Sequence, residues 1–206
     1  HAGGQELARH DGRNDPGFAL HAVVEPTPGR HTLGSQLYYE MFALWTRVDG
    51  LPRVQRFYPK RRKYLADDTH AKMDAACSQF TALINGAGIC LFGAFLGVQR
   101  IPVFEWINAV TGWQKTPAEY MRIGWTIQSM RQAFNARQGV PLRHMIPGRA
   151  VGLPPLKEGA NHGRTLALDE MVQKYWSAME WDPLTGLPPL ERLELLDRSV
   201  NIADEG

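Results

Sequence analysis

Residues 116–139 read TPAEYMRIGWTIQSMRQAFNARQG, and this stretch decides the fold. Thr116 and Glu119 have the spacing of a helix capping box, and Pro117 occupies the first helical position, where its missing N–H needs no partner. Gly139 then supplies a C-terminal stop. The sequence therefore predicts a helix from Pro117 to about Gln138, with one apolar face formed by Tyr120, Ile123, Ile127, Met130 and Phe134.

Further helical patterns lie on both sides of this helix. Asp67 suits a helix N-cap, and the pattern after it runs through Met73 and Phe80 towards Leu83. Residues 1–34 lack a sustained period and are expected to form a connecting segment, whereas 140–165 read as a long loop rich in proline and glycine. The expected fold class is all-α, mostly helical with long loops, with additional helices over 36–48, 89–97, 101–112, 168–181 and 189–196.

The composition excludes several classes of protein. The 206 residues carry a formal charge of only +2, and the basic residues are scattered outside one cluster at 60–63, so we expect no nucleic-acid partner. The most apolar stretch, 81–98, is interrupted by Asn85 and glycines, which argues against a membrane span. With only two cysteines a disulfide scaffold is excluded, and we expect a reducing, cytoplasmic location. The N-terminus has no signal-peptide pattern and looks like an arbitrary cut.

Cys90 is the candidate metal ligand. It follows a glycine-containing turn at 85–88, and if it begins a helix, the backbone N–H groups there would lower its pKa and favour thiolate ligation. The alternative is a buried core cysteine, which is common for this residue type and which we expect for Cys77. An ordinary iron–sulfur cluster needs four thiolates, so this chain cannot complete one by itself.

His31 is the candidate for proton chemistry. It lies in the rigid polar stretch 28–32, where an imidazole could give or take a proton near neutral pH, although a surface-loop histidine is the commoner case. No pair among the seven histidines has the i, i+4 spacing of a metal site on a helix. Glu25 could face a site. For Trp125, Tyr175 and Trp176 we expect a core role, because their helical spacing matches that of buried residues.

Several motifs occur in a particular order along nearly the whole chain. They are GQE and HDGR within 4–13, AVVEPTPGRH at 22–31, NGAGIC at 85–90, MRQAFNARQG at 130–139, PGR at 147–149, and LDEM, YW, EWD and GLP between 168 and 188. Together they resemble the C-terminal domain of the aldehyde ferredoxin oxidoreductase family, whose most telling motif, D-x-x-G-L-C, corresponds to residues 85–90. The resemblance implies that 1–206 is this helical domain and that an N-terminal pterin-binding domain lies outside the chain.

The resemblance also implies roles for individual residues. Cys90 would be the fourth thiolate of a [4Fe-4S] cluster whose other ligands lie in an upstream C-x-x-C-x-x-x-C motif. Asn85 stands where the family usually has an aspartate that holds pterin amino groups, and an amide carbonyl can still accept such a bond without charge. Gly88 and Ile89 would complete the cofactor-binding turn. His31 falls near a family histidine proposed for proton transfer, which makes it the implied catalytic residue.

The implied function is oxidation of aldehydes to carboxylic acids at a tungsten or molybdenum bis-pterin centre, with electrons passing through the cluster to ferredoxin. The implied partners are the N-terminal pterin-binding part of the same enzyme, ferredoxin, a small aldehyde and, as one option, a second copy in a homodimer. Two alternatives stay open: a reductase of the same family that acts on an aromatic acyl thioester, and a helical interaction module without catalytic activity.

Overall fold

The computed structural model describes residues 1–33, 39, 42–53, 64–90, 92–93 and 99–193. Within this part of the chain the regular structure is helical, which confirms the expected all-α fold class. Its elements are α1 (Pro16–Val24), the 3-10 helix η1 (His31–Leu33), α3 (Leu44–Arg47), α4 (Asp68–Gly86), α6 (Val103–Thr111), α7 (Pro117–Arg137), the 3-10 helix η3 (Gly148–Val151) and α8 (Leu168–Ala178).

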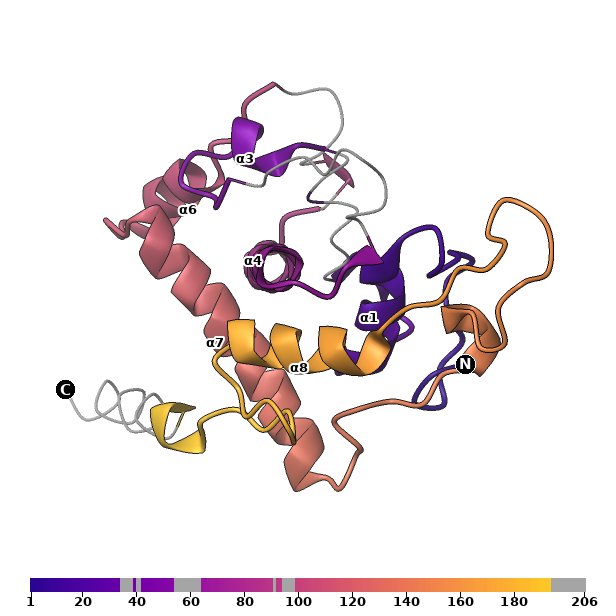
Figure 1. Cartoon of the computed structure of the whole chain (residues 1–206). Helices are drawn as coiled ribbons and strands as arrows, with labels where there is room; N and C mark the ends of the chain where they lie inside the picture. Colours follow the sequence, from indigo (N-terminus) through magenta and orange to yellow (C-terminus); the bar gives the residue numbers. More distant parts are fainter. Residues whose placement is uncertain (34–38, 40–41, 54–63, 91, 94–98, 194–206) are drawn as a thin grey trace.

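The two longest helices, α4 and α7, cross at the centre of the fold (Figure 1). Gly124 of α7 makes the crossing possible, because a Cβ atom there would lie 2.0 Å from the backbone oxygen of Gln79 on α4. The two helices therefore meet backbone to backbone. Helix α8 packs on α4 as well and contacts α1. Because α4 also contacts η1, it touches elements from both halves of the chain.

The start of α7 confirms the expected capping box. Thr116 Oγ1 accepts from the Glu119 N–H, and the Glu119 carboxylate accepts from the Thr116 N–H at 2.7 Å. The apolar face behaves differently from an ordinary core face, because Met130 and Phe134 are 56% and 62% exposed. The buried face of α7 includes the polar residues Gln128, Ser129 and Gln132.

Each of these polar residues on α7 has a partner that makes its burial tolerable. Gln128 donates to the Glu25 carboxylate at 2.7 Å, Gln132 donates to the Gly186 carbonyl at 3.2 Å, and Ser129 accepts from the Trp181 indole N–H at 2.8 Å. A hydrophobic period on a helix therefore does not identify the buried side here.

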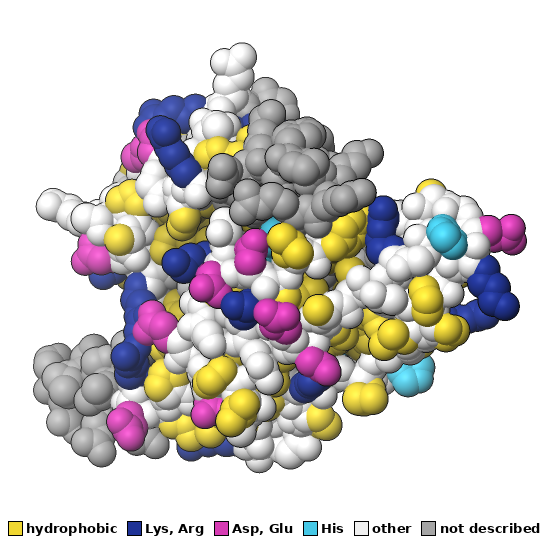
Figure 2. All heavy atoms as spheres, in the orientation of Figure 1, with side chains coloured by type: hydrophobic (Ala, Val, Ile, Leu, Met, Phe, Trp, Pro, Cys, Tyr) yellow, Lys and Arg dark blue, Asp and Glu magenta, His cyan; other side chains and the backbone are white. Residues whose placement is uncertain are grey.

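The described core divides into two apolar clusters. One joins α4, α6 and the first half of α7 and includes Met73, Phe80, Ile84, Phe104 and Tyr120. The other joins α1, α8 and Trp125 of α7 and includes Leu20, Val23, Val172, Tyr175 and Trp176. The core roles expected for Cys77, Trp125, Tyr175 and Trp176 are confirmed. On the face shown in Figure 2, acidic and basic side chains are interspersed, and hydrophobic side chains reach the surface between them.

Three sequence-based expectations need correction. Residues 1–34 contain a helix, α1, that is buried along its whole length, so an irregular connecting segment is wrong for Pro16–Val24. A continuous helix over 36–48 is also wrong, because Ala43 has a left-handed backbone (φ 45°) and α3 begins only at Leu44. The turn expected at 85–88 begins later, since α4 continues through Gly86.

Parts of three expected helices lie outside the described residues: 36–38 and 40–41 of the first, 91 and 94–97 of the second, and 194–196 of the last. Residues 92–93 and 190–193, which are described, are helical. None of the helices in the described ranges is long and apolar enough to cross a membrane.

Candidate functional site

The turn that carries Cys90 is fixed by the end of α4. Gly88 has a positive φ of 72°, a conformation that glycine adopts without strain, and the Ile89 N–H donates to the Ile84 carbonyl at 2.9 Å. Ile89 packs against the first apolar cluster. A Cβ atom on Gly88 would meet nothing within 4 Å, so this glycine is required by the shape of the turn and not by a close neighbour.

Cys90 and Cys77 differ completely in their surroundings. Cys77 is fully buried, and burial raises the pKa of its thiol far above the ordinary value, so it is a neutral core residue. Cys90 is exposed, and the backbone N–H of Gly93 lies 3.5 Å from its Sγ. An N–H group aimed at sulfur is the kind of contact that stabilises a thiolate ligand. The buried-core alternative for Cys90 is therefore wrong.

Cys90 is suited to be one ligand of a metal centre, not the whole set. Among the described residues there is no group of three or more His, Cys, Asp or Glu side chains that could hold a metal ion. Since the chain has only two cysteines and Cys77 is in the core, three further thiolates for a cluster have to come from outside this chain.

Asn85 lies in the last turn of α4 with its side chain exposed. Its Nδ2 donates to the Thr81 carbonyl at 2.7 Å, which fixes the amide and leaves Oδ1 as the atom that can accept from an outside donor. Thr81 also contacts the His31 region, because its Oγ1 lies 2.7 Å from the Leu33 carbonyl of η1. The same hydroxyl lies 2.7 Å from the Cys77 carbonyl and donates to one of the two at a time.

An apolar groove of about 410 Å³ adjoins the Cys90 turn. Gly86, Ala87 and Ile89 form one wall, and side chains of α6 and α7 form the other. Its rim is unusually apolar for a protein surface: Val110 is 88% exposed, and Trp106 and Trp113 are about half exposed. Ile123 and Ile127 also line the groove, so the apolar face predicted for α7 faces it and continues past it to Met130 and Phe134.

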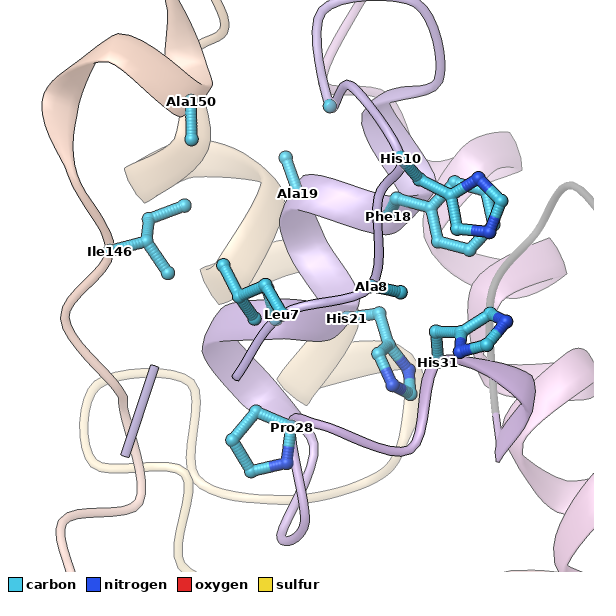
Figure 3. Close-up of a pocket in the computed structure, with 12 residues that line it drawn as sticks. Leu7, Ala8, His10, Phe18, Ala19, His21, Pro28, His31, Ile146 and Ala150 are labelled. Carbon is cyan, nitrogen blue, oxygen red and sulfur yellow. The ribbon is translucent and has the colours of Figure 1, made fainter. Parts of the chain in front are cut away.

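His31 lies in a second group of residues, between the N-terminal segment and α1 (Figure 3). Its ring is 5.0 Å from the ring of His10 at an angle of 50°, and His10 in turn stacks on Phe18 at 4.1 Å with an interplanar angle of only 7°. The ring of His21 extends from α1 towards the loop that leads to His31. Three histidines of the first 31 residues therefore lie near one another, on the N-terminal segment, on α1 and on η1.

The backbone around His31 is held by hydrogen bonds from two sides. The Arg30 carbonyl accepts from the Leu33 N–H and lies 3.0 Å from His21 Nε2, which must therefore be the protonated ring nitrogen. The Gly29 N–H donates to the Gln5 side chain at 2.8 Å. Burial lowers the pKa of the enclosed His21, so that it remains a neutral donor.

Partial burial, and secondarily the positive charge of His10, lower the pKa of His31. The cavity beside these residues has a volume of about 40 Å³. This is room for a few water molecules at most, since one water needs about 10–15 Å³. The His31 site can therefore exchange protons with water, but it cannot hold an organic substrate without walls supplied from elsewhere.

The long loop at 140–165 contributes to this site. Ile146 and Ala150 line the His31 cavity. Asn161 donates at 3.1 Å to the carboxylate of Asp11, the residue after His10, and Arg164 donates to the Arg13 carbonyl at 3.0 Å. The loop thus fixes the segment that presents His10.

Glu25 does not face a site. Its carboxylate is nearly fully buried and accepts from Arg131 Nη2 at 2.5 Å and from Gln128 at 2.7 Å. Sequence reasoning also missed His10 and His21, because no spacing rule for a site connects them with His31. The Asp15-Pro16 pair, an N-cap followed by proline, was the signal that could have found α1 and hence His21.

A family model described as "Aldehyde ferredoxin oxidoreductase, domains 2 & 3" matches residues 1–197. The chain belongs to this family. Similar proteins include the tungsten-containing aldehyde ferredoxin oxidoreductases of Pyrococcus furiosus, 32% identical over 70% of this chain, and of Pyrococcus abyssi, 28% identical over 93% of it. That of Thermococcus kodakarensis is 29% identical over 70% of the chain.

The aldehyde ferredoxin oxidoreductase family is thus shown by a match that covers almost the whole chain, as the sequence motifs indicated. The matched parts make up only 24% to 29% of the length of the relatives. The chain therefore spans less than a third of the length of these relatives.

Proposed function

We propose that this chain is the part of an aldehyde ferredoxin oxidoreductase-like enzyme that supplies the last thiolate of a [4Fe-4S] cluster and a histidine for proton transfer. The observation that carries the proposal is the exposed Cys90 thiol, presented on a glycine turn at the edge of an exposed apolar groove. A thiolate that shares a cluster with three thiolates from another part of the enzyme has to project from the surface in this way.

The apolar surface supports a second body as the partner. Trp106, Val110 and Trp113 at the groove and Met130 and Phe134 beyond it are all exposed, and contiguous apolar surface of this kind marks an interface. The relatives are three to four times longer than their matched part, as the 24% to 29% coverage requires. We propose that the N-terminal pterin-binding part of the same enzyme covers this surface and brings its three cysteines to Cys90.

The residues present fit the implied cofactors only in part. Cys90 fits one position of a cluster, and the Asn85 carbonyl, oriented by its bond to Thr81, fits an acceptor for a pterin amino group. A bound tungsten or molybdenum bis-pterin supplies the oxidising centre, and the cluster supplies the path for electrons to ferredoxin. Asn85 is neutral, so its contact with a pterin is weaker than that of a carboxylate.

The proposed reaction needs a proton acceptor. Oxidation of an aldehyde to a carboxylic acid, with water as the source of the added oxygen, releases two electrons and two protons. The electrons would be passed on to the acceptor, and the two protons have to reach solvent. His31 suits the proton path because its lowered pKa keeps it neutral near pH 7 and because it borders a cavity of water size.

Metal analysis of the full-length enzyme tests the proposal. The protein is purified anaerobically, and its iron, sulfide, tungsten and molybdenum are measured in the wild type, in Cys90→Ser and in Cys77→Ala. We expect Cys90→Ser to lose the cluster and Cys77→Ala, which removes a core thiol, to retain it. Full iron and sulfide in Cys90→Ser would contradict the ligand role, and a metal-free wild type would favour the interaction module.

The substrate is tested separately. Reduction of a redox dye by the full-length enzyme is measured with a series of aldehydes. In a separate assay, reduction of an aromatic acyl thioester is measured with a low-potential electron donor. We expect aldehyde-dependent dye reduction. Activity only with the thioester would replace the aldehyde proposal by the reductase alternative.

A further inference from the structure

Thr81 of α4 contacts both parts of the candidate site. Its backbone carbonyl accepts from Asn85 Nδ2 at 2.7 Å, about one helical turn further along α4. Its hydroxyl lies 2.7 Å from the carbonyl of Leu33, the last residue of the η1 helix that begins at His31. The proposed pterin acceptor and the proposed proton acceptor are therefore connected through a single residue.

The Thr81 hydroxyl has two possible acceptors, and the Leu33 carbonyl has the greater need of a donor. Oγ1 also lies 2.7 Å from the Cys77 carbonyl, but a carbonyl in the middle of an α-helix already accepts the N–H four residues further on, here that of Thr81 itself. Among the described residues, the Thr81 hydroxyl is the donor that the structure provides for the Leu33 carbonyl. Thr81 is fully buried, where a polar group without a partner is costly, so the hydroxyl proton belongs to Leu33.

The short helix η1 is held at both of its ends. At its start, the Arg30 carbonyl lies 3.0 Å from His21 Nε2 of α1. At its end, Thr81 of α4 binds Leu33, whose side chain is also buried. A helix of three residues does not hold itself in place, because helix formation is favourable only over longer stretches. His31 extends from this helix and lines the cavity shown in Figure 3, so the place of its ring depends on the two end contacts.

Threonine is not the residue that helix stability alone would favour at position 81. A β-branched side chain whose hydroxyl bonds to its own helix slightly destabilises that helix. Valine has nearly the same shape and would avoid the burial of a hydroxyl group. The bond to η1 is therefore the feature that distinguishes threonine from valine here.

We propose that Thr81 is a positioning residue: it fixes η1, and with it the His31 ring, relative to the Asn85 turn that would hold the pterin. This inference rests on the proposed functions of His31 and Asn85, and it adds a residue that acts through them. Asn85 binds the backbone of Thr81, whereas η1 binds its side chain. A substitution at Thr81 can therefore release η1 and leave the Asn85 contact in place.

Three variants of the full-length enzyme test this role. Thr81→Val keeps the shape but removes the donor to η1, and Thr81→Ser keeps the hydroxyl. Thr126→Val is the matched control, because the Thr126 hydroxyl donates to the Arg122 carbonyl of its own helix, α7, at 3.0 Å. We expect kcat for aldehyde oxidation to fall by a factor of about 10–100 in Thr81→Val, as for a small displacement of a catalytic group, with KM and metal content unchanged. We expect Thr81→Ser and Thr126→Val to keep the wild-type kcat.

The outcomes separate a positioning role from a structural one. A wild-type kcat in Thr81→Val would overturn the proposal. A Thr81→Val enzyme that is unfolded or has lost its metals, or a Thr81→Ser enzyme with the same loss of activity, would show a merely structural role and would overturn it as well. Full activity of His31→Gln would instead refute the proposed role of His31, whatever the Thr81 variants show.

A spectroscopic measurement gives a readout that does not depend on turnover. The full-length enzyme is labelled with 13C at histidine Cε1, and the His31 signal is assigned from the spectrum of His31→Gln. We expect this signal to move in Thr81→Val and to keep its position in Thr81→Ser and Thr126→Val. An unchanged His31 signal in Thr81→Val would show that Thr81 does not fix the ring and would refute the inference even if the proposed function is correct.

Discussion

Replacing Gly124 by alanine has two opposite effects on the stability of the fold: it favours the helical state of α7, and it disturbs the packing of α7 on α4. In an isolated helix the change would stabilise by about 1 kcal/mol. Here the added Cβ would lie 2.0 Å from the Gln79 oxygen and 2.7 Å from its carbonyl carbon, and both atoms belong to the backbone of α4. Overpacking of a core typically costs about 1–3 kcal/mol, and a backbone cannot yield as a side chain can. We therefore expect a net loss of about 2 kcal/mol in the free energy of unfolding.

The measurement is urea unfolding of the full-length protein, followed by far-UV circular dichroism. The expected loss corresponds to a decrease of about 4–8 °C in Tm for a domain of this size. Gly86→Ala is the matched control, because its Cβ would meet only the end of the Ile127 side chain, at 3.0 Å, and that side chain can rotate away. If Gly124→Ala is as stable as the wild type while Gly86→Ala behaves as a control, the α4–α7 crossing described above is incorrect.

Three further predictions concern stability. Arg131→Met leaves the buried Glu25 carboxylate without its ion pair, and we expect the free energy of unfolding to fall by about 3 kcal/mol. This is the lower end for buried pairs, because Arg131 is partly exposed. Adding Glu25→Gln to Arg131→Met should restore part of this stability, and a change near zero in Arg131→Met would show that the pair is not formed. Thr116→Ala removes the cap of α7 and should cost about 1 kcal/mol, measured by thermal unfolding, with no effect expected if that helix end is frayed. His21 has a lowered pKa in the folded state, so the unfolded state binds more protons below about pH 6.5, and stability falls as the pH decreases from 7 to 5. His21→Gln keeps a donor for the Arg30 carbonyl but does not titrate, so its stability should depend less on pH over this range; an unchanged slope would assign the effect to other groups.

The elements predicted correctly are those specified by neighbouring residues. The box formed by Thr116 and Glu119 and the cap formed by Asp67 act within one helical turn, and both are present in the structure. Helix α1 was missed because it is apolar and buried on every side, so it has no period of polar and apolar residues to detect. The C-terminal half of the apolar face of α7 was detected but is exposed, because the periodicity identifies an apolar stripe and not what covers it.

In the candidate site, too, the features set by neighbouring residues were predictable and those set by tertiary contacts were not. The Cys90 turn is contiguous in sequence, and its motif was recognisable; the structure adds that the thiol is exposed and that Asn85 is tied to Thr81. The histidine cluster depends on the approach of the N-terminal segment to α1, which is set by long-range contacts such as the bond between Asn161 and Asp11. A sequence without its tertiary contacts does not show that His10 and His31 are neighbours.

The exposed apolar stripe on α6 and α7 also has a consequence for biosynthesis. Chains are made from the N-terminus, and their domains generally fold in that order. In the proposed enzyme, the pterin-binding part is therefore complete before the exposed residues Trp106 and Val110 leave the ribosome. The surface that covers them has then already folded. In that case the apolar stripe is covered as soon as the helical part folds. If the chain is synthesised alone, the apolar stripe is exposed to solvent, and we expect the chain to bind chaperones or to aggregate.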